Sequence, residues 1–172
     1  MEDILDVIKT RRSVRAYKSN AVPTELLDKV LEAGTYAPTG KNRQSPVIVA
    51  ITDKDTRKLI GELNAAVLGA DTDPYYGAPV VVLVLVDPSV NTRVEDGACV
   101  LENMMLEAHS LGLATVWVHR EREIFDAPSG KELLKKWGLN ENLQGVGSIA
   151  LGYASGDLPE AKPRKDGYIV KV

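Results

Sequence analysis

Two groups of basic residues at opposite ends of the sequence have side chains of the types that can bind phosphate. The run Arg11-Arg-Ser-Val-Arg15 holds three arginines within five residues, and Lys162-Pro-Arg-Lys165 holds three cations near the other end. Arginine presents a planar fork of N–H donors that matches phosphate oxygens. On a chain of net charge −3, the two groups could fold together around one anion. Charge alone favours the simpler alternative, two solvated basic runs that serve solubility.

A loop between Gly34 and Gln44 has the composition of a nucleotide-phosphate loop. Such a loop has four residues between its glycines and a Ser or Thr after its lysine, but here five residues lie between Gly34 and Gly40, and Asn42 follows Lys41. A phosphate loop also leaves a strand and begins a helix. The apolar spacing before this loop predicts a helix, and the β-branched run after it predicts a strand. The pattern therefore argues against an NTPase.

Other common chemistries lack the residues they need. Two histidines and one cysteine, Cys99, are too few and too scattered for a zinc site, so no metal is expected. The sequence holds neither a Rossmann glycine fingerprint nor a Gly-x-Ser-x-Gly elbow, and its net negative charge argues against nucleic-acid binding. The first residues lack a signal-peptide layout, and the longest apolar run, residues 78–86, is too short to span a membrane. With one cysteine and no disulfide, we expect a cytoplasmic protein without membrane contact.

The spacing of apolar residues predicts the elements that position these groups. Helical periodicity, the N-cap Asp53 and a capping box at Ser129–Glu132 predict helices at residues 3–9, 23–34, after 53, 94–111 and after 129. Short β-branched runs predict strands at residues 47–52, 80–86, 114–119 and 145–152. The long helix is apolar on two faces, so it should be buried on more than one side or shared with a partner subunit. The order of elements indicates one α+β domain over residues 1–172.

Four motifs occur in order over nearly the whole chain. They are the helix followed by Arg-Arg-Ser-Val-Arg15, the helix that ends in Ala-Pro-Thr-Gly-Lys-Asn-Arg-Gln44, the segment Asp96–Leu113, and Gly152-Tyr followed by Lys162-Pro-Arg-Lys165. In these motifs the sequence resembles the compact branch of the FMN-dependent nitroreductase family. The resemblance implies a central mixed or antiparallel sheet flanked by helices, with a long central helix. It also implies a homodimer, in which the extended C-terminal tail, rich in proline and charge, reaches the partner subunit.

The resemblance also assigns cofactor contacts. Arg11, Lys162 and Arg164 would hold the FMN phosphate, while Arg12 and Ser13 would lie along the ribityl chain. Arg15 would face the N1–O2 edge of the flavin, where a cation favours the negative charge of the reduced ring. The turn of the neighbouring subunit would pack against the ring through Pro38, Thr39 and Gly40, with Asn42 as a polar contact. Lys41 and Arg43 could equally belong to an ordinary connection.

Two further contacts are expected near the ring. Asn64 could supply an amide to the O2 or N3 edge, or could lie on a helix surface. The segment Trp117-Val118-His119 would place its backbone near the flavin N5, with His119 as a weak catalytic candidate beside a ring that carries the chemistry. The sequence departs from the family pattern where Ser45-Pro46 follows the loop and where His119 and Arg120 replace small or acidic residues, so the substrate class does not carry over.

The expected function is the NAD(P)H-dependent, two-electron reduction of a small-molecule acceptor. NADH or NADPH would leave a hydride on the flavin, and a nitroaromatic or quinone-like acceptor would then take the electrons at the same place. This ping-pong use of one site requires no protein nucleophile and no strong acid–base pair. The alternative from a different class is a flavin-binding protein that stores or senses flavin without turnover.

Overall fold

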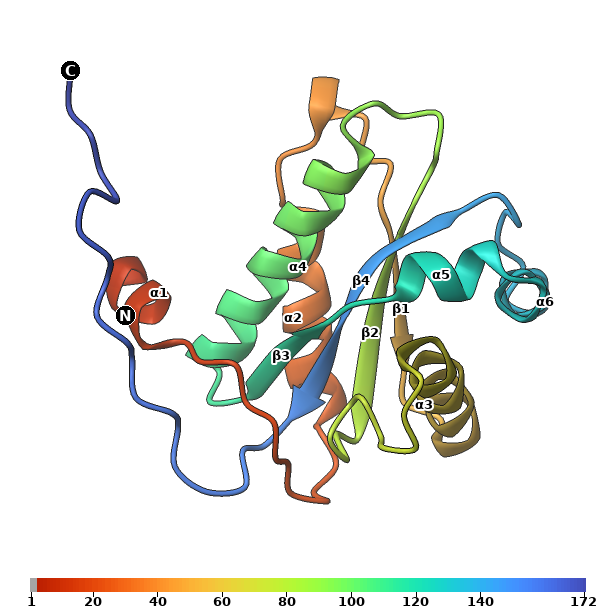
Figure 1. Cartoon of the computed structure of the whole chain (residues 1–172), viewed down its shortest axis with the longest axis horizontal. Helices are drawn as coiled ribbons and strands as arrows, with labels where there is room; N and C mark the ends of the chain where they lie inside the picture. Colours follow the sequence, from red (N-terminus) through yellow and green to blue (C-terminus); the bar gives the residue numbers. More distant parts are fainter. Residues whose placement is uncertain (1–2) are drawn as a thin grey trace.

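The structure is a computed structural model and describes residues 3–172, which form a four-stranded antiparallel sheet with helices on both faces (Figure 1). The strands are β1 (Val47–Ile51), β2 (Val80–Val86), β3 (Ala114–Val118) and β4 (Gln144–Gly152). The helices are α1 (Ile4–Thr10), α2 (Thr24–Thr35), α3 (Lys54–Leu68), α4 (Arg93–Ser110), α5 (Glu121–Asp126) and α6 (Pro128–Lys136), with a 3₁₀ turn η1 (Gly40–Asn42). The expected α+β class and sheet are confirmed.

The sheet has the strand order β1-β2-β4-β3, and each neighbouring pair is antiparallel. Every residue of the central strand β2 is buried. Its even-numbered residues join the apolar cluster on one face, and its odd-numbered residues, from Val81 to Leu85, join the cluster on the other. A strand that is apolar at every position must be covered on both faces. This requirement fixes the layered arrangement of the helices.

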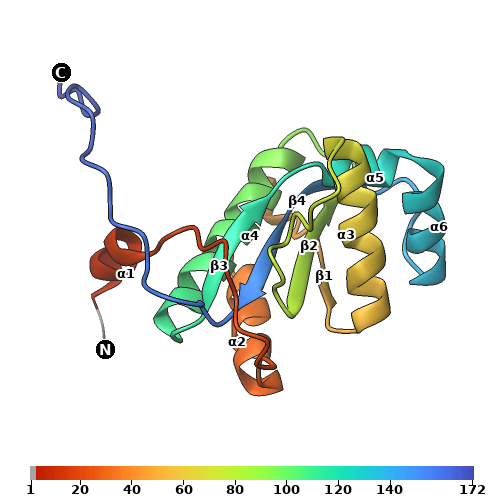
Figure 2. The same cartoon turned by 60° about the horizontal axis from the view of Figure 1, so that its bottom comes forward.

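Helices α2 and α4 cover one face of the sheet, and α3, α5 and α6 cover the other (Figure 2). Helix α4 contacts α1, α2 and three of the strands, so the expectation that it is buried on several sides is confirmed. It approaches β4 closely at Gly97, where an added Cβ would lie 2.7 Å from a methyl of Val146. A register shift in the β2–β4 ladder between Val84 and Leu85 marks a bulge at that part of β4.

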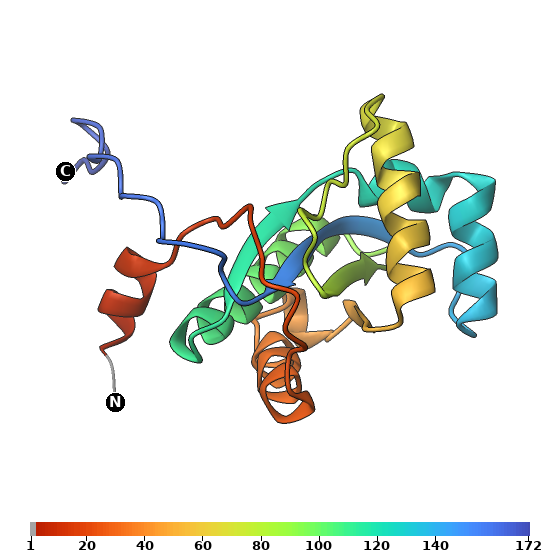
Figure 3. The same cartoon turned by 90° about the horizontal axis from the view of Figure 1, so that it is seen from below.

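Helix α1 and the C-terminal tail stand together at one side of the molecule (Figure 3). Ile4, Leu5 and Ile8 of α1 are 64%, 49% and 51% exposed. Beyond an isolated bridge between Tyr17 and Ala154, the tail to residue 172 forms no helix or strand. The tail is therefore extended, as expected, and its reach to a partner subunit stays a prediction.

The predicted helices and strands all exist, but one local prediction about the segment after β3 is wrong and one short helix there was not predicted. Helix α6 begins at Pro128 after the N-cap Ala127, with no side-chain cap, so Ser129 lies inside the helix and forms no capping box. Proline is favoured in the first helical turn because it needs no N–H partner there. Helix α5 was not predicted, because six residues are too few to give a clear period. Among residues 3–172, no helix is long and apolar enough to cross a membrane.

Candidate functional site

The two basic groups meet in one cavity of about 650 Å³ beside α1. Arg11, Arg12 and Ser13 line it from the segment after α1, and Lys162 and Arg164 line it from the tail. The Arg12 side chain joins the two segments, since its Nε donates to the Pro159 carbonyl at 3.1 Å. The structure thus favours convergence of the two basic groups. Charge alone had favoured two separate solvated runs.

Arg11, one of the residues that line this cavity, has a side-chain donor without an acceptor among residues 3–172. Nη1 of Arg11 is buried and has no hydrogen-bond partner in the part of the chain that the structure describes. Lys9 adds a further cation to the lining and Glu160 a single carboxylate, so the cavity is strongly positive. A guanidinium donor only donates, and leaving it buried and unpaired costs free energy. A phosphate dianion accepts hydrogen bonds from Arg and Lys side chains, so the cations that line this cavity fit the phosphate of FMN.

Strand β3 links this cavity to the second group of expected contacts. It is an edge strand, and Ser13 bridges to it at Thr115, where the Val14 N–H donates to the Thr115 carbonyl at 3.0 Å. His119 is the fourth residue after Thr115, which is roughly 13 Å along an extended chain. An edge strand presents free N–H and C=O groups. The distance is compatible with a ligand that has a phosphate at one end and a flat ring at the other, and the placement of such a ligand along β3 stays a prediction.

The turn after β3 is held from α3. Arg120 has the left-handed φ of 88°, which is costly for a residue with a side chain and needs support. The Arg120 Nε donates to Oδ1 of Asn64 at 2.8 Å, and Nδ2 of Asn64 donates to the His119 carbonyl at 2.9 Å. The imidazole of His119 is exposed. Asn64 thus ties two consecutive residues of the turn to the body of the protein.

This geometry corrects both expectations for Asn64. Its side chain is fully buried, so Asn64 does not lie on a helix surface. Both polar atoms of its amide are already engaged within the chain, so it offers no free amide to a ring edge. The indole of Trp117 lies against Gly147 of β4, where an added Cβ would come within 2.7 Å of the indole nitrogen. Trp117 therefore packs on the sheet, and the contact of its backbone with the ring stays a prediction.

Beneath the turn lies a buried polar cluster that the sequence did not reveal. Glu121, the first residue of α5, is fully buried, as are Tyr75 and Ser148. Oε1 of Glu121 accepts hydrogen bonds from the hydroxyls of Ser148 and Tyr75 and, at 3.3 Å, from Nδ2 of Asn64. Burial raises the pKa of Glu121 to about 7 against the opposing effect of these hydrogen bonds. A glutamate at the start of a helix is normally solvated, so its residue type gives no signal of this role.

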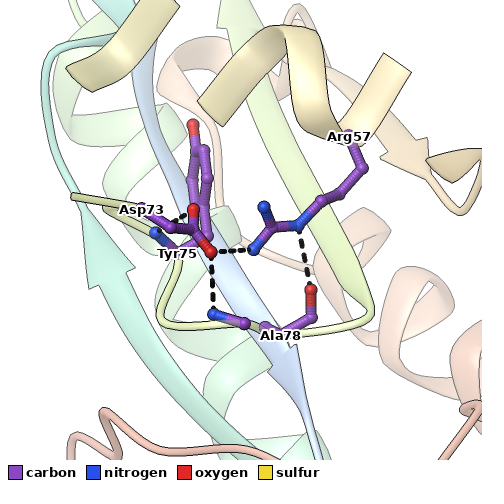
Figure 4. Close-up of polar contacts among 5 residues, drawn as sticks. Arg57, Asp73, Tyr75 and Ala78 are labelled. Atoms are coloured by element: carbon purple, nitrogen blue, oxygen red, sulfur yellow. Dashed lines mark hydrogen bonds and ion pairs between the residues drawn. The ribbon is translucent and has the colours of Figure 1, made fainter. Parts of the chain in front are cut away.

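An ion pair positions Tyr75 for that cluster (Figure 4). Arg57 of α3 contacts Asp73 at 2.6 Å and donates from its Nε to the Ala78 carbonyl at 3.0 Å. Asp73 also accepts the N–H groups of Tyr75 and Gly77. Burial opposes ionisation of Asp73, but the hydrogen bonds from Arg57 and the two backbone groups outweigh it and lower the pKa. The loop before β2 is therefore fixed, with the Tyr75 ring directed inward.

The loop that holds Pro38, Thr39, Gly40 and Asn42 lies elsewhere, at the N-terminal end of α4 (Figure 1). The Gly40 N–H donates to Oδ1 of Asp96 at 2.9 Å, whereas α1 meets the other end of the helix through Thr10 and His109. His109 is thirteen residues after Asp96 on the same helix, a rise of roughly 20 Å. Within one chain the loop and the basic cavity are therefore well apart.

Comparison with known proteins identifies the family. The profile of the nitroreductase family matches residues 8–73. A solved nitroreductase with bound FMN from Bacteroides fragilis is 33% identical, covers 100% of both chains and superposes with a TM-score of 0.91. The chain belongs to the nitroreductase family. The resemblance seen in the four sequence motifs is thereby confirmed.

Two more nitroreductases agree with this assignment. A nitroreductase with bound FMN from Desulfitobacterium hafniense is 27% identical and covers 100% of this chain and 99% of that one, with a TM-score of 0.88. A relative from Methanothermobacter thermautotrophicus that carries the name of an NAD(P)H nitroreductase is 34% identical over 119 residues. That match covers 67% of this chain and 60% of the relative, so it spans less than two thirds of the relative's length.

The loop of residues 38–44 is anchored by one buried carboxylate. Asp96 is 4% exposed and accepts the Gly40 N–H and, at 2.9 Å, the Thr92 hydroxyl. It holds a loop in which Lys41, Asn42 and Gln44 all have positive φ, an uncommon conformation for residues with side chains. The loop is therefore fixed by an anchor at its first turn.

Asp96→Asn should lower the free energy of unfolding by about 1–2 kcal/mol, because hydrogen bonds to a charged group contribute more than neutral ones. Urea denaturation of the variant measures this loss. Glu95→Gln makes the same chemical change at the neighbouring exposed position of α4 and should have little effect. Equal effects of the two substitutions would contradict the anchoring role of Asp96.

Proposed function

We propose that this single domain of residues 1–172 is an NAD(P)H-dependent FMN oxidoreductase that reduces small-molecule acceptors, such as nitroaromatics or quinones, by a ping-pong mechanism. The observation that carries the proposal is that cations from both ends of the sequence, Arg11, Lys162 and Arg164, line one cavity. The FMN-bound solved relatives support the choice of ligand. Bound FMN would supply a ring that accepts a hydride at N5 and passes on two electrons.

The residues of the chain seat this cofactor. Arg11, Lys162 and Arg164 hold the phosphate, and Arg12 and Ser13 lie along the ribityl chain. The backbone of Trp117, Val118 and His119 lies against the ring, which remains open to an acceptor on the other side. In this arrangement the protein provides charge and position, and no side chain acts as a nucleophile.

The second subunit completes the site. The loop of Pro38, Thr39, Gly40 and Asn42 contacts the ring of the partner, because the long helix α4 keeps it away from the cavity of its own chain. The exposed apolar residues of α1 and the tail residues Tyr168 and Ile169 give a second copy a surface to cover. Sedimentation of the FMN-loaded protein should give a homodimer, and a stable monomer that retains FMN would contradict it.

Turnover is tested by anaerobic mixing of the FMN-loaded protein with NADH or NADPH. We expect the visible flavin band to bleach and then to return on addition of a quinone or a nitroaromatic compound, with no ternary complex required. A protein that binds FMN but is not bleached by either nucleotide would instead be a flavin store or sensor. Comparison of the two nucleotides also gives the donor preference.

The two ends of the site should respond differently to loss of a cation. Arg15→Ala should weaken binding of reduced FMN more than oxidised FMN, because Arg15 faces the ring edge where charge collects on reduction. By linkage the reduction potential falls, by about 30 mV for each 1.4 kcal/mol of differential binding. Arg164→Ala should weaken both forms equally, because the phosphate keeps its charge. Potentiometry on the two variants tests these roles. A reduction potential that changes only in Arg164→Ala would contradict the placement of Arg15 at the ring and Arg164 at the phosphate.

A further inference from the structure

The carboxyl group of Glu121 is buried and lies next to the turn that ends the candidate site. Within residues 3–172 its hydrogen bonds to other side chains involve one of its two oxygens. Its Oε1 accepts from three uncharged groups, the hydroxyls of Ser148 and Tyr75 and the amide of Asn64. Its Oε2 is buried and has no partner among residues 3–172. Donors at Oε1 stabilise the carboxylate, and the free Oε2 is the place where a proton would bind.

Few charges surround this carboxyl. Its own turn contributes Arg120, whose positive charge favours ionisation, and the exposed His119. The loop before β2 contributes the phenol of Tyr75, and behind it Arg57 and Asp73 neutralise each other. Helix α3 and strand β4 contribute the uncharged Asn64 and Ser148.

Burial and hydrogen bonding therefore oppose each other within this cluster. Burial raises the pKa of Glu121 to about 7, so both protonation forms of the carboxyl are present near neutral pH. A further charge placed near the turn would shift the balance between the two forms.

The turn connects the cluster to the site. Nδ2 of Asn64 donates both to the His119 carbonyl and to Oε1 of Glu121, and Oδ1 of the same amide accepts from Arg120. Resting on the proposed function, which sets the flavin ring against this turn, we propose that Glu121 takes up a proton when the ring is reduced and so compensates the negative charge that reduction adds.

The step balances in charge and atoms. A hydride from NAD(P)H brings two electrons and one proton, so the ring gains one negative charge and the nucleotide leaves oxidised. The Glu121 carboxylate binds one proton from solvent, which forms an O–H bond at Oε2, and no other bond in the protein changes. Because linkage is reciprocal, a protonated Glu121 favours the reduced ring and an ionised Glu121 opposes it.

The effect of Glu121→Gln on the reduction potential of bound FMN should depend on pH, because the carboxyl group is neutral in acid and ionised in alkali. At acidic pH Glu121 is already neutral, so Glu121→Gln should leave the reduction potential of bound FMN close to that of the unaltered protein. At alkaline pH the ionised Glu121 opposes reduction, so the unaltered protein should have the lower potential of the two. A tenfold change in the preference for reduced over oxidised flavin corresponds to about 30 mV.

Potentiometry of the FMN-loaded proteins from about pH 5.5 to about pH 8.5 tests the proposal across the range in which the carboxyl titrates. Glu123→Gln makes the same change at an exposed position of α5, and its potential should follow that of the unaltered protein at every pH. The comparison is repeated in a His119→Gln background, because His119 lies in the same turn as Arg120 and next to the cluster. Ser148→Ala removes one donor to Oε1, so its pH midpoint should move upward.

The apoprotein provides a readout without flavin. Because the folded pKa of Glu121 is raised above its unfolded value, its contribution to stability is present below the unfolded pKa and is lost as pH rises towards about 7. The urea midpoint of the unaltered protein should therefore fall relative to Glu121→Gln over that range. A potential gap that does not vary with pH, in proteins that bind and reduce FMN, overturns this inference alone. A protein that binds no FMN overturns the proposed function as well.

Discussion

Replacing Arg11 with alanine should raise the dissociation constant for FMN by roughly 10- to 150-fold. Hydrogen bonds to charged groups contribute about 1.5–3 kcal/mol, and each 1.4 kcal/mol is a factor of ten. Arg11 is expected to have the largest effect among the cations of the cavity, because its Nη1 is buried and unpaired while Lys162 and Arg164 are exposed. Fluorescence titration of the apoprotein with FMN measures the change.

Riboflavin is the sharpest control for this substitution, because it has the same ring and ribityl chain without the phosphate. Arg11→Ala should leave riboflavin binding nearly unchanged. Lys58→Ala removes an exposed cation of α3 and should change neither affinity. If Arg11→Ala weakened riboflavin and FMN equally, the cavity would not be the phosphate site.

Gly145→Ala should destabilise the protein at the upper end of the roughly 1–3 kcal/mol that overpacking costs. An added Cβ at Gly145 would lie 2.4 Å from the carbonyl carbon of Glu121 and 2.5 Å from its oxygen, so the backbone of α5 must move. Because Glu121 directly follows the Arg120 turn, FMN binding should weaken as well. Gly61→Ala on α3 is the comparison, since the first atom that its Cβ meets is a side-chain oxygen of Asp73 at 3.3 Å.

Urea denaturation of the two glycine variants measures their stability, and FMN titration measures their affinity for the cofactor. The expected result is a much larger loss of stability for Gly145→Ala than for Gly61→Ala, with a weaker FMN affinity only in the former. A Gly145→Ala protein with unchanged stability and affinity would contradict the close packing of β4 against the turn.

The helices and strands could be predicted from the sequence because the patterns that indicate them are local. The uninterrupted apolar run of β2, the apolar faces of α4 and the Asp53 cap each depend on neighbours within a few residues, and all three elements formed as predicted. The convergence of Arg11 with the tail was predicted through the family resemblance. It could not follow from charge alone, since an anion site and two solvated runs have the same composition.

The buried cluster under the turn was not predictable, for a physical reason. Asn64, Tyr75, Glu121 and Ser148 come from four separate parts of the chain, and only the packing of α3 and α5 on the sheet brings them together. Each of these residue types is common on protein surfaces, so the sequence alone does not indicate that these residues are buried. The anchor at Asp96 was missed in the same way, because an acidic residue in the first turn of a helix is ordinarily a solvated partner of the helix dipole.

The central claim, that the cavity and strand β3 together form an FMN site, is tested most directly by the cofactor content of the purified protein. The protein is denatured after exhaustive desalting, and the released flavin is separated and quantified against chain concentration. The account predicts FMN, bound without a covalent link, at about one molecule per chain, with its content strongly reduced in Arg11→Ala. Recovery of FAD, or of no flavin from a protein that also fails to bind added FMN, would contradict it.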